Sequence, residues 1–272
     1  MIRSPALGQL ARSMILLDPT AHPVIGHRGA SAEVPENTLP SFLRAIEQGV
    51  DAIELDVHVT ADDIPVVMHD PTVMRTTSGE GAIAGMSLRR LRELDAGARF
   101  TADGGKTYPY REQGIRVPTV EEVLAAIPAD MPMLIEVKAI HAQWALRRVL
   151  ERFKAAPRSV VAAFEAGSLN AFLEPPFTCG ASRRDVLQLM ARTAAGLKPA
   201  RVPYRAICPP NEYYGVPVPL GLIVRGARAI KAPVHVWTVD EPAEARRLWG
   251  LGVNGIISNA PAGILEARNR KA

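Results

Sequence analysis

The sequence is poor in cysteine, in aromatic residues and in long apolar runs. Its 272 residues include two cysteines, Cys179 and Cys208, whose spacing matches no metal-binding or redox motif. We interpret them as buried free thiols, which suits a cytoplasmic protein better than a secreted or periplasmic one. No stretch approaches the roughly 18 apolar residues of a membrane span, so no stable membrane insertion is expected. Aromatic residues make up 5% of the chain, which predicts a core of Ala, Val, Leu and Ile.

The chain also lacks the sequence signals of nucleic-acid binding and of nucleotide-phosphate loops. The formal net charge is +4, and the basic residues are spread as pairs along expected helices instead of clustering with aromatic residues. No Walker or GxGxxG pattern is present. We therefore expect a small-molecule partner and no nucleic acid, and a homo-oligomer is possible.

From residue 24 onward, short apolar strands alternate with helical patterns. Eight strands are expected near residues 24–26, 52–60, 133–138, 160–164, 178–182, 205–208, 234–239 and 255–258. Strand–helix alternation predicts parallel strands, and eight such units predict an α/β fold of the TIM (β/α)8 barrel type. A doubly wound open sheet is the alternative, although it would need a phosphate loop at its switch point.

The domain organisation follows from the same pattern. Residues 1–22 are expected to form an N-terminal extension, and residues 23–270 the barrel domain. A short apolar segment at 66–68 is not counted as a barrel strand. Residues 71–116 have no strong period and are too long for an ordinary connection, so they predict a small inserted subdomain after the second barrel strand.

The strand expected at residues 52–60 carries charged side chains on one of its faces. Successive side chains of a strand point to opposite faces, so Glu54, Asp56 and His58 share one face and the apolar residues share the other. Helices cover the outside of a TIM barrel, so the charged face must point inward. Glu136 stands in the same relation to its own strand, and three carboxylates then meet. Three oxygen ligands without cysteine suit Mg²⁺ or Ca²⁺.

Further polar and aromatic residues lie near the carboxyl ends of the expected strands, where TIM-barrel sites gather. They are His27, Arg28, His69, Lys138 and Trp237. Each residue alone has a plain structural interpretation, but their convergence on one end of the barrel favours an active site.

The order of several short motifs makes the resemblance to a known family specific. The motifs are His27-Arg28-Gly29, Pro35-Glu36-Asn37-Thr38, Glu54-Leu55-Asp56-Val57, Val66-Val67-Met68-His69-Asp70, Arg75-Thr76-Thr77-Ser78-Gly79, Pro118-Thr119-Val120-Glu121-Glu122-Val123-Leu124, Glu136-Val137-Lys138 and Trp237-Thr238-Val239. From about residue 24 to 265, the chain resembles the glycerophosphodiester phosphodiesterase family.

The resemblance implies a TIM barrel that uses one divalent cation, Mg²⁺ or Ca²⁺, to hydrolyse glycerophosphodiesters to an alcohol and glycerol 3-phosphate. It also implies the roles of individual residues. These are metal ligands at Glu54, Asp56 and Glu136, a general acid and base at His27 and His69, and substrate contacts at Arg28, Lys138 and Trp237. His58 has no catalytic role in the family motif.

A few departures from the family pattern leave the alcohol of the substrate open. Ala163 stands where the family often has Ser, and Asn254 and Asn259 stand where it usually has Asp. Residues 175–220 match weakly. A lysophospholipase D-like activity or hydrolysis of another diester is therefore an alternative. A non-catalytic barrel that binds a phosphate ligand, and a barrel lyase or isomerase, are further alternatives.

Overall fold

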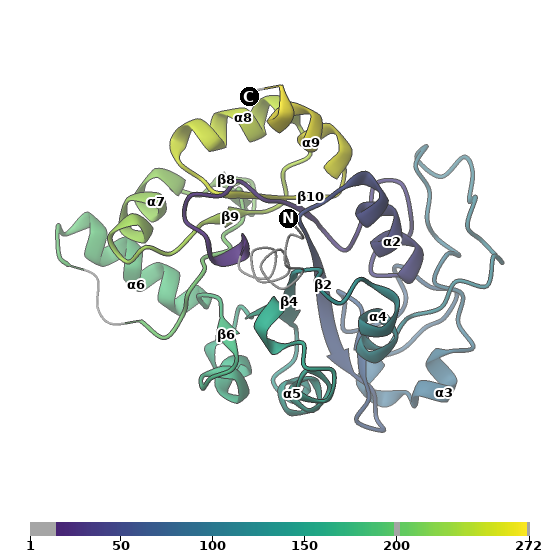
Figure 1. Cartoon of the computed structure of the whole chain (residues 1–272). Helices are drawn as coiled ribbons and strands as arrows, with labels where there is room; N and C mark the ends of the chain where they lie inside the picture. The colour runs from purple at the N-terminus through teal and green to yellow at the C-terminus, as the bar shows by residue number, and fades with distance from the viewer. Residues whose placement is uncertain (1–14, 199–201, 271–272) are drawn as a thin grey trace, which may run out of the picture.

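A parallel β-sheet that curls on itself forms the centre of the molecule (Figure 1). The computed structural model describes residues 15–198 and 202–270. Neighbouring strands follow the order β6-β5-β4-β2-β1-β10-β9. The strands are β1 (Val24–Gly26), β2 (Ala52–Val59), β4 (Met133–Val137), β5 (Ser159–Ala162), β6 (Thr178–Cys179), β9 (His235–Val236) and β10 (Gly255–Ser258).

Residues 205–210 close this sheet into a barrel. Parallel bridges join Gly180 to Ala206 and Ile207 to Val234, which connects the β6 side of the sheet to the β9 side. The segment forms isolated bridges instead of a regular strand, and Pro209 and Pro210, which have no backbone N–H to donate to a ladder, follow directly after Cys208. The predicted TIM barrel is confirmed. At 205–208, where the sequence predicts a strand, the structure has only isolated β-bridges.

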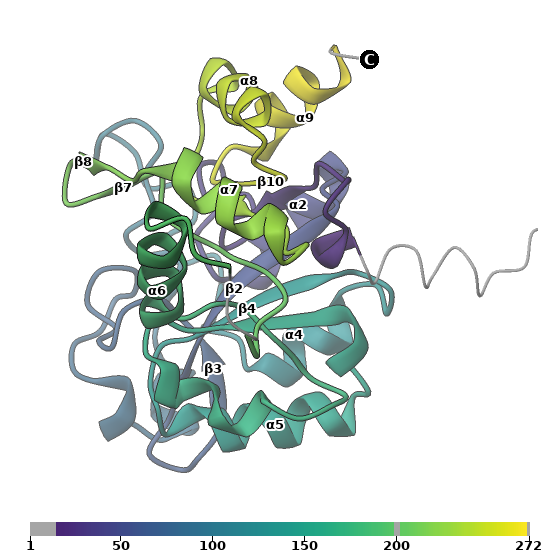
Figure 2. The same ribbon diagram turned by 90° about the vertical axis from the view of Figure 1, so that its left-hand side faces the viewer.

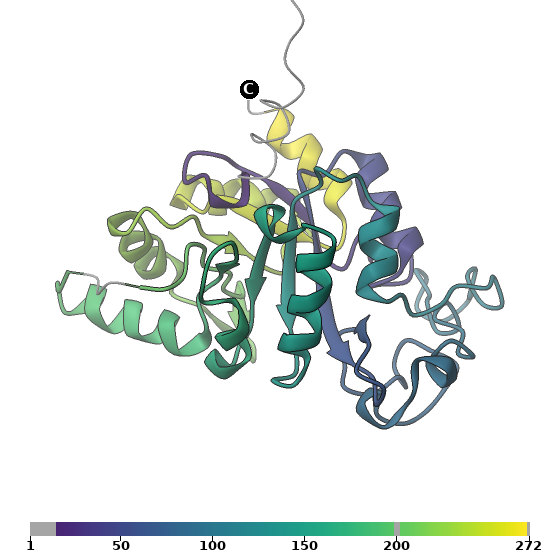
Figure 3. The same cartoon turned by 60° about the horizontal axis from the view of Figure 1, so that its bottom comes forward.

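Helices cover the outside of the barrel (Figures 1 and 3). The α-helices are α2 (Leu39–Gln48), α4 (Val120–Ala126), α5 (Ala142–Arg152), α6 (Arg183–Ala194), α7 (Leu220–Ala229), α8 (Pro242–Leu251) and α9 (Pro261–Asn269). After β5 the chain forms two turns of 3-10 helix, η4 (Ala166–Phe172), where the sequence predicts a helix; a shorter one, η3 (Ala156–Arg158), precedes β5. Among the described residues, no helix has both the length and the apolar composition to cross a membrane.

The two faces of β2 have different surroundings, as the alternation of its residues predicts. Ile53 and Leu55 belong to the large apolar core that also contains helix residues. Ala52 belongs to a separate cluster inside the barrel. Glu54 and Asp56 share the face of Ala52, so their side chains point into the barrel.

A short 3-10 helix, η1 (Ile15–Leu17), lies at the end of the barrel where the strands begin. Leu16 is 1% exposed and packs in the interior cluster with Ile25 and Ala52. His235, at the start of β9, donates a hydrogen bond from Nε2 to the Leu16 carbonyl oxygen at 2.9 Å. Residues 1–14 of the expected N-terminal extension lie outside the described residues, whereas Ile15–Leu17 contribute to the barrel core.

The segment between β2 and α4 adds a second, smaller core to one side of the barrel. It begins with β3 (Pro65–Val67), which pairs antiparallel with β2, and continues through η2 (Ile83–Gly85) and α3 (Leu88–Leu91). Its buried residues form an apolar cluster of their own. The antiparallel pairing explains why the apolar segment at 66–68 is not a barrel strand.

A β-hairpin that the sequence does not predict projects from the segment before α7 (Figure 2). It consists of β7 (Glu212–Tyr213) and β8 (Val216–Pro217), with two residues between them. These two-residue strands are too short to show a period of apolar residues, and their side chains are exposed.

Candidate active site

Three carboxylates meet at the carboxyl ends of two neighbouring strands. Glu54 and Asp56 come from β2 and Glu136 from β4, and one carboxylate oxygen of each lies within 4.8 Å of the others. The register pairs Asp56 directly with Glu136, which explains why residues eighty positions apart converge. Glu54 is 4% and Asp56 1% exposed, so these carboxylates are held away from bulk water.

Two cations lie against the carboxylates. Lys138 follows β4, and its Nζ is 3.0 Å from Asp56 Oδ1 and 2.8 Å from Glu136 Oε1. Arg28 follows β1; its Nε is 3.2 Å from Asp56 Oδ2, and its backbone N–H donates to Glu54 Oε2 at 2.9 Å. The cluster therefore contains three acidic groups and two permanent positive charges.

The pKa values of the carboxyl groups reflect this imbalance. Burial and the neighbouring charge of Asp56 raise the pKa of Glu54 well above its ordinary value. Burial also raises the pKa of Glu136, although Lys138 opposes the shift. Burial alone would raise the pKa of Asp56, but Lys138 and Arg28 outweigh it and lower that pKa. The site thus favours additional positive charge beside Glu54 and Glu136.

Two buried polar atoms at the centre of the cluster have no hydrogen-bond partner. Asp56 Oδ1 is an acceptor without a donor in hydrogen-bonding geometry, and Arg28 Nε is a donor without an acceptor. Lys138 Nζ lies 3.0 Å from Asp56 Oδ1, and Asp56 Oδ2 lies 3.2 Å from Arg28 Nε, so both atoms are in ion pairs and keep unused capacity for a hydrogen bond or a ligand. The acceptor fits a cation and the donor fits an anion, which is the pairing that a metal ion and a phosphate would supply.

The turn after β1 holds Arg28 in an unusual backbone conformation. Arg28 has φ 55° and Gly29 has φ 88°, both in the left-handed region. Any Cβ at position 29 would lie 2.4 Å from Ser41 Oγ, so only glycine fits there. The Ser41 hydroxyl and the Asn37 backbone N–H both donate to the Arg28 carbonyl oxygen, at 2.9 and 3.0 Å. These bonds to α2 and its preceding loop stabilise a turn that costs about 1–3 kcal/mol in isolation.

His27 has one ring nitrogen engaged and the other directed toward the carboxylates. Asn259 donates from Nδ2 to Asp240 Oδ2 at 2.9 Å, so its Oδ1 faces His27 and accepts from Nδ1 at 2.7 Å. His27 Nε2 lies 4.0 Å from Glu54 Oε2. Burial and then the charge of Arg28 lower the pKa of His27 to about 4, so the ring is neutral near pH 7 and Nε2 carries the lone pair.

His69 has a different partner. Its Nδ1 donates to Asp70 Oδ1 at 2.6 Å, and its backbone carbonyl oxygen accepts from His58 Nε2 at 3.1 Å. Burial lowers the pKa of His69, while the charge of Asp56 opposes this shift. The hydrogen bond from Arg75 is the main cause that lowers the pKa of Asp70 to about 2, so Asp70 is a carboxylate that fixes the ring of His69. His58 supports the backbone of His69.

A chain of ion pairs connects the two sides of the site through residues that the sequence analysis did not select. Arg75 donates two hydrogen bonds to Glu36 at 2.7 Å each and two to Asp70 at 2.7 and 3.2 Å. Glu36 also accepts from Arg28 Nη1 at 2.8 Å. The motif residues Glu36 and Arg75 were part of the resemblance, but nothing in their sequence neighbourhood shows that they contact each other across 39 positions.

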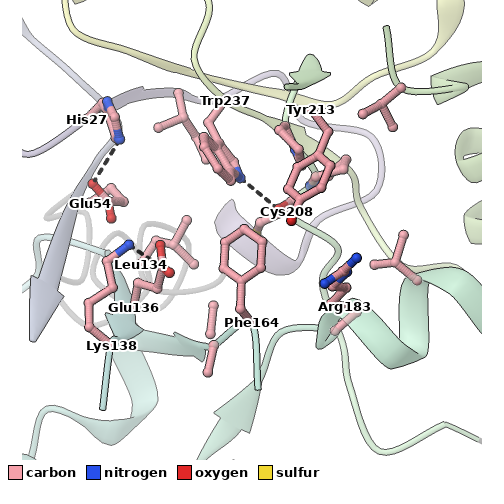
Figure 4. Close-up of a pocket in the computed structure, with 18 of the residues that line it drawn as sticks. His27, Glu54, Leu134, Glu136, Lys138, Phe164, Arg183, Cys208, Tyr213 and Trp237 are labelled. Atoms are coloured by element: carbon pink, nitrogen blue, oxygen red, sulfur yellow. Dashed lines mark hydrogen bonds and ion pairs between the residues drawn. The ribbon is translucent and has the colours of Figure 1, made fainter. Parts of the chain in front are cut away.

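A cavity of about 270 Å³ opens beside this cluster (Figure 4). The predicted site residues that line it are His27, Arg28, Glu54, His69, Glu136, Lys138 and Trp237. Asp56 contacts Arg28 and Lys138 from below the surface of the cavity. The structure therefore brings all eight predicted residues together, while their individual roles stay predictions. Phe164, Arg183 and Tyr213 also line the cavity and were not predicted.

Comparison with known proteins identifies the family of the chain. The family model described as the glycerophosphoryl diester phosphodiesterase family matches residues 27–262. The chain belongs to this family. It is 32% identical over 250 residues to a glycerophosphodiester phosphodiesterase of Caldanaerobacter subterraneus, covering 88% of this chain and 94% of that protein. The matched range includes both histidines and all three carboxylates. The chain is therefore a phosphodiesterase, and its cavity lies at the end of the barrel where the sequence predicts the site.

Solved structures show the same fold. The glycerophosphoryl diester phosphodiesterase domain of a Mycobacterium tuberculosis protein has a TM-score of 0.80 at 24% identity, covering 91% of this phosphodiesterase and 99% of that chain. A phosphodiesterase of Oleispira antarctica, solved with the product sn-glycerol-3-phosphate, has a TM-score of 0.71 at 24% identity and covers 92% and 97%. These similarities extend over the whole barrel.

Proposed function

We propose that the protein hydrolyses glycerophosphodiesters to an alcohol and glycerol 3-phosphate and that it uses one divalent cation, Mg²⁺ or Ca²⁺. The observation that carries this proposal is the buried cluster of three carboxylates, in which Asp56 Oδ1 and Arg28 Nε lie close to opposite charges but make no hydrogen bond. Family membership supports the reaction class. The product named for the Oleispira antarctica phosphodiesterase, sn-glycerol-3-phosphate, supports the substrate class.

The charges of the site suit a phosphodiester monoanion. Glu54, Asp56 and Glu136 would hold the cation, and Arg28 and Lys138 would bind phosphate oxygens. When bound, the cation polarises phosphoryl oxygens and lowers the pKa of an oxygen nucleophile. Three carboxylates, two basic side chains and a divalent cation leave one positive charge, which matches the single negative charge of the substrate.

His27 and His69 would transfer protons on the two sides of the phosphate. Each has its Nδ1 engaged by Asn259 or Asp70, which leaves Nε2 available to exchange a proton. One ring removes a proton from the attacking hydroxyl and the other delivers a proton to the leaving alkoxide. Trp237 lines the cavity, and its Nε1 donates to the Cys208 carbonyl oxygen at 2.9 Å, so the rest of its ring offers apolar surface to a substrate.

Activity assays with and without metal test this proposal. Protein treated with excess chelator is expected to lose hydrolysis of glycerophosphodiesters and to regain it with Mg²⁺ or Ca²⁺. Glu54→Gln should impair this recovery because it removes one ligand charge, whereas Glu47→Gln, at an exposed position of α2, should not. His27→Ala and His69→Ala should each lower kcat by roughly 10²–10⁴.

Full activity in a large excess of chelator would contradict the metal requirement. Wild-type rates in both histidine variants would contradict their role in proton transfer. Binding of a diester without turnover, across metals and pH, would instead show a non-catalytic phosphate-binding barrel. The cytoplasmic location and the possible homo-oligomer stay predictions from the sequence.

A further inference from the structure

The cavity has two parts with different chemistry. The part described above contains the charged cluster. The other part, which we call the apolar arm, lies between α6 and the segment after β9 and is lined by Phe164, Val186, Leu187, Met190, Tyr213 and Trp237 (Figure 4). Glycerol and small polar alcohols offer no apolar surface for such an arm, so its lining requires an explanation from the substrate.

One face of α6 forms the first wall of the apolar arm. Arg183, Val186, Leu187 and Met190 line the cavity at spacings of three, four and seven residues, which places them on one side of the helix. Val186 and Met190 also pack on the barrel core, but Leu187 is 55% exposed. Together these side chains form a continuous apolar surface along the cavity, and an apolar ligand in the arm would cover Leu187.

Aromatic residues form the opposite wall. Phe164 and Trp237 pack edge to face with ring centroids 5.9 Å apart, and Phe164 is 38% exposed. The only polar atom of the Trp237 side chain is engaged by a backbone carbonyl oxygen, so the ring offers the cavity only apolar surface. Tyr213, from the β7–β8 hairpin, lies under the guanidinium of Arg183, whose carbon is 5.4 Å from the ring centroid.

The charges near the apolar arm disfavour a cationic alcohol such as choline. Aromatic walls can bind a quaternary ammonium group, but such sites gain from nearby negative charge. Among the described residues that line the cavity, the acidic ones are Glu54 and Glu136, and both belong to the carboxylate cluster. Arg183 places a positive charge at the arm itself. An uncharged apolar group therefore fits the arm better than a cation does.

We propose that the substrate is a phosphodiester that carries a single acyl or alkyl chain, and that the apolar arm holds this chain while the phosphate lies at the carboxylate cluster. This inference rests on the proposed function. Hydrolysis would add the oxygen of water to phosphorus, break the bond from phosphorus to one alcohol oxygen, and return a proton to that oxygen. Single-chain lysophospholipids are the natural members of this class, and α6 and the aromatic wall would contact the chain from two sides.

A chain-length series tests the inference. The substrates are glycerophosphocholine and its hexanoyl, octanoyl, decanoyl and lauroyl monoesters, each below its critical micelle concentration and with the full-length, metal-supplemented protein. If the arm holds the chain, kcat/KM should rise roughly tenfold for each added pair of methylene groups until the chain extends beyond the arm.

Two leucine variants localise the effect. Leu187→Glu places a charge in the apolar arm and should lower kcat/KM for the lauroyl ester at least tenfold more than for glycerophosphocholine. Leu197→Glu is the matched control, because Leu197 is also 55% exposed but does not line the cavity. It should change neither value.

The outcomes separate this inference from the proposed function. If no substrate is hydrolysed, the proposed function fails. If glycerophosphocholine is hydrolysed but kcat/KM does not rise with chain length, only the inference about the chain is overturned. The inference also fails if Leu187→Glu lowers both activities equally, or if glycerophosphocholine is the best substrate, since the aromatic wall would then bind the trimethylammonium group.

Discussion

At the scale of single residues, the two histidines of the site differ in the charge of their partners. His27 donates to the neutral amide of Asn259, whereas His69 donates to the carboxylate of Asp70. A carboxylate partner stabilises an imidazolium, and an amide does so far less. The residue at position 259 therefore contributes to the protonation equilibrium of His27 without lining the cavity.

Replacing Asn259 by Asp is expected to raise the pKa of His27. The wild-type pKa is lowered to about 4, first by burial and then by the charge of Arg28, and a carboxylate at Nδ1 would oppose both effects. We expect an increase of about one unit or more, so the ring becomes protonated at higher pH. The acidic limb of the pH–activity profile should move to higher pH if His27 is the general base, and the alkaline limb if it is the general acid. Titration of the His27 ring by NMR measures the change directly.

The neighbouring Asp240 offers a control for this prediction. Asn259→Asp alone places two carboxylates together, because Asn259 Nδ2 normally donates to Asp240 Oδ2 at 2.9 Å. Asn259→Asp combined with Asp240→Asn removes that repulsion and keeps the carboxylate beside His27. The increase in the pKa of His27 should persist in the double variant; an unchanged pKa in both would contradict the argument.

At the scale of elements, the segment between β3 and α4 contributes to the site through Arg75. The guanidinium joins Asp70, which fixes His69, to Glu36, which holds Arg28. Burial alone would raise the pKa of Glu36, but its bonds to Arg75 and the charge of Arg28 outweigh burial and lower it. An element outside the barrel thus positions two predicted site residues that come from different loops.

Arg75→Gln is expected to lower kcat/KM by about 10- to 100-fold, the usual cost of losing a partner that orients active-site groups. Arg75→Lys should recover little of this loss, because an ammonium cannot make the four hydrogen bonds of the guanidinium. Steady-state kinetics measure the effect. If Arg75 acts through His69, the variant should also have an altered pH–activity profile, whereas a merely structural role would leave that profile unchanged.

Arg92→Gln is the matched control. Arg92 lies in the same segment, its side chain is 49% exposed against 46% for Arg75, and it pairs with Glu122 away from the cavity. Its loss should leave kcat/KM near the wild-type value. If both variants lose activity equally, the segment contributes only by its folding and the positioning role of Arg75 is wrong.

The elements that the sequence predicts are those with a period. Residues 52–60 alternate strictly, so the direction of Glu54 and Asp56 follows from the strand alone. The β7–β8 hairpin has two residues per strand, which is too short to show a pattern. The strand predicted at 205–208 is present only as isolated bridges. The contact of Arg75 with Glu36 depends on how a long irregular segment folds back, which no local pattern specifies.

At the scale of the whole molecule, one end of the barrel carries the candidate active site and the other end is closed by apolar packing. The carboxyl ends of the strands carry the charged cluster, and the opposite end is closed by η1 with Leu16 in the interior cluster. The count of eight strand–helix units predicts the barrel, because closure depends only on that repeat. It does not predict which segment closes the lower end, since a run of four apolar residues fits many positions.

The contact of η1 with the buried His235 is expected to make the free energy of unfolding depend on pH. His235 is fully buried, its Nε2 donates to the Leu16 carbonyl oxygen, and its Nδ1 has no partner. A Cβ at position 255 would lie 2.2 Å from this Nδ1, so the ring nitrogen packs closely against the backbone of Gly255. A proton on Nδ1 would thus create a buried charge without a partner, and burial lowers the pKa of His235 to about 4.

Acidification should therefore destabilise the fold between about pH 6.5 and pH 4. In that interval the unfolded state binds the proton more strongly than the folded state, so the free energy of unfolding falls as pH falls. The contribution of His235 is at most about 3 kcal/mol, since one pKa unit corresponds to about 1.36 kcal/mol.

His235→Gln keeps a donor for Leu16 but does not titrate, so its urea-unfolding free energy should depend less on pH than that of the wild type. His141→Gln, at an exposed position, should leave the wild-type slope unchanged. Parallel curves for the wild type and His235→Gln would show that the pKa of His235 is the same in the folded and unfolded states, which would contradict the effect of burial.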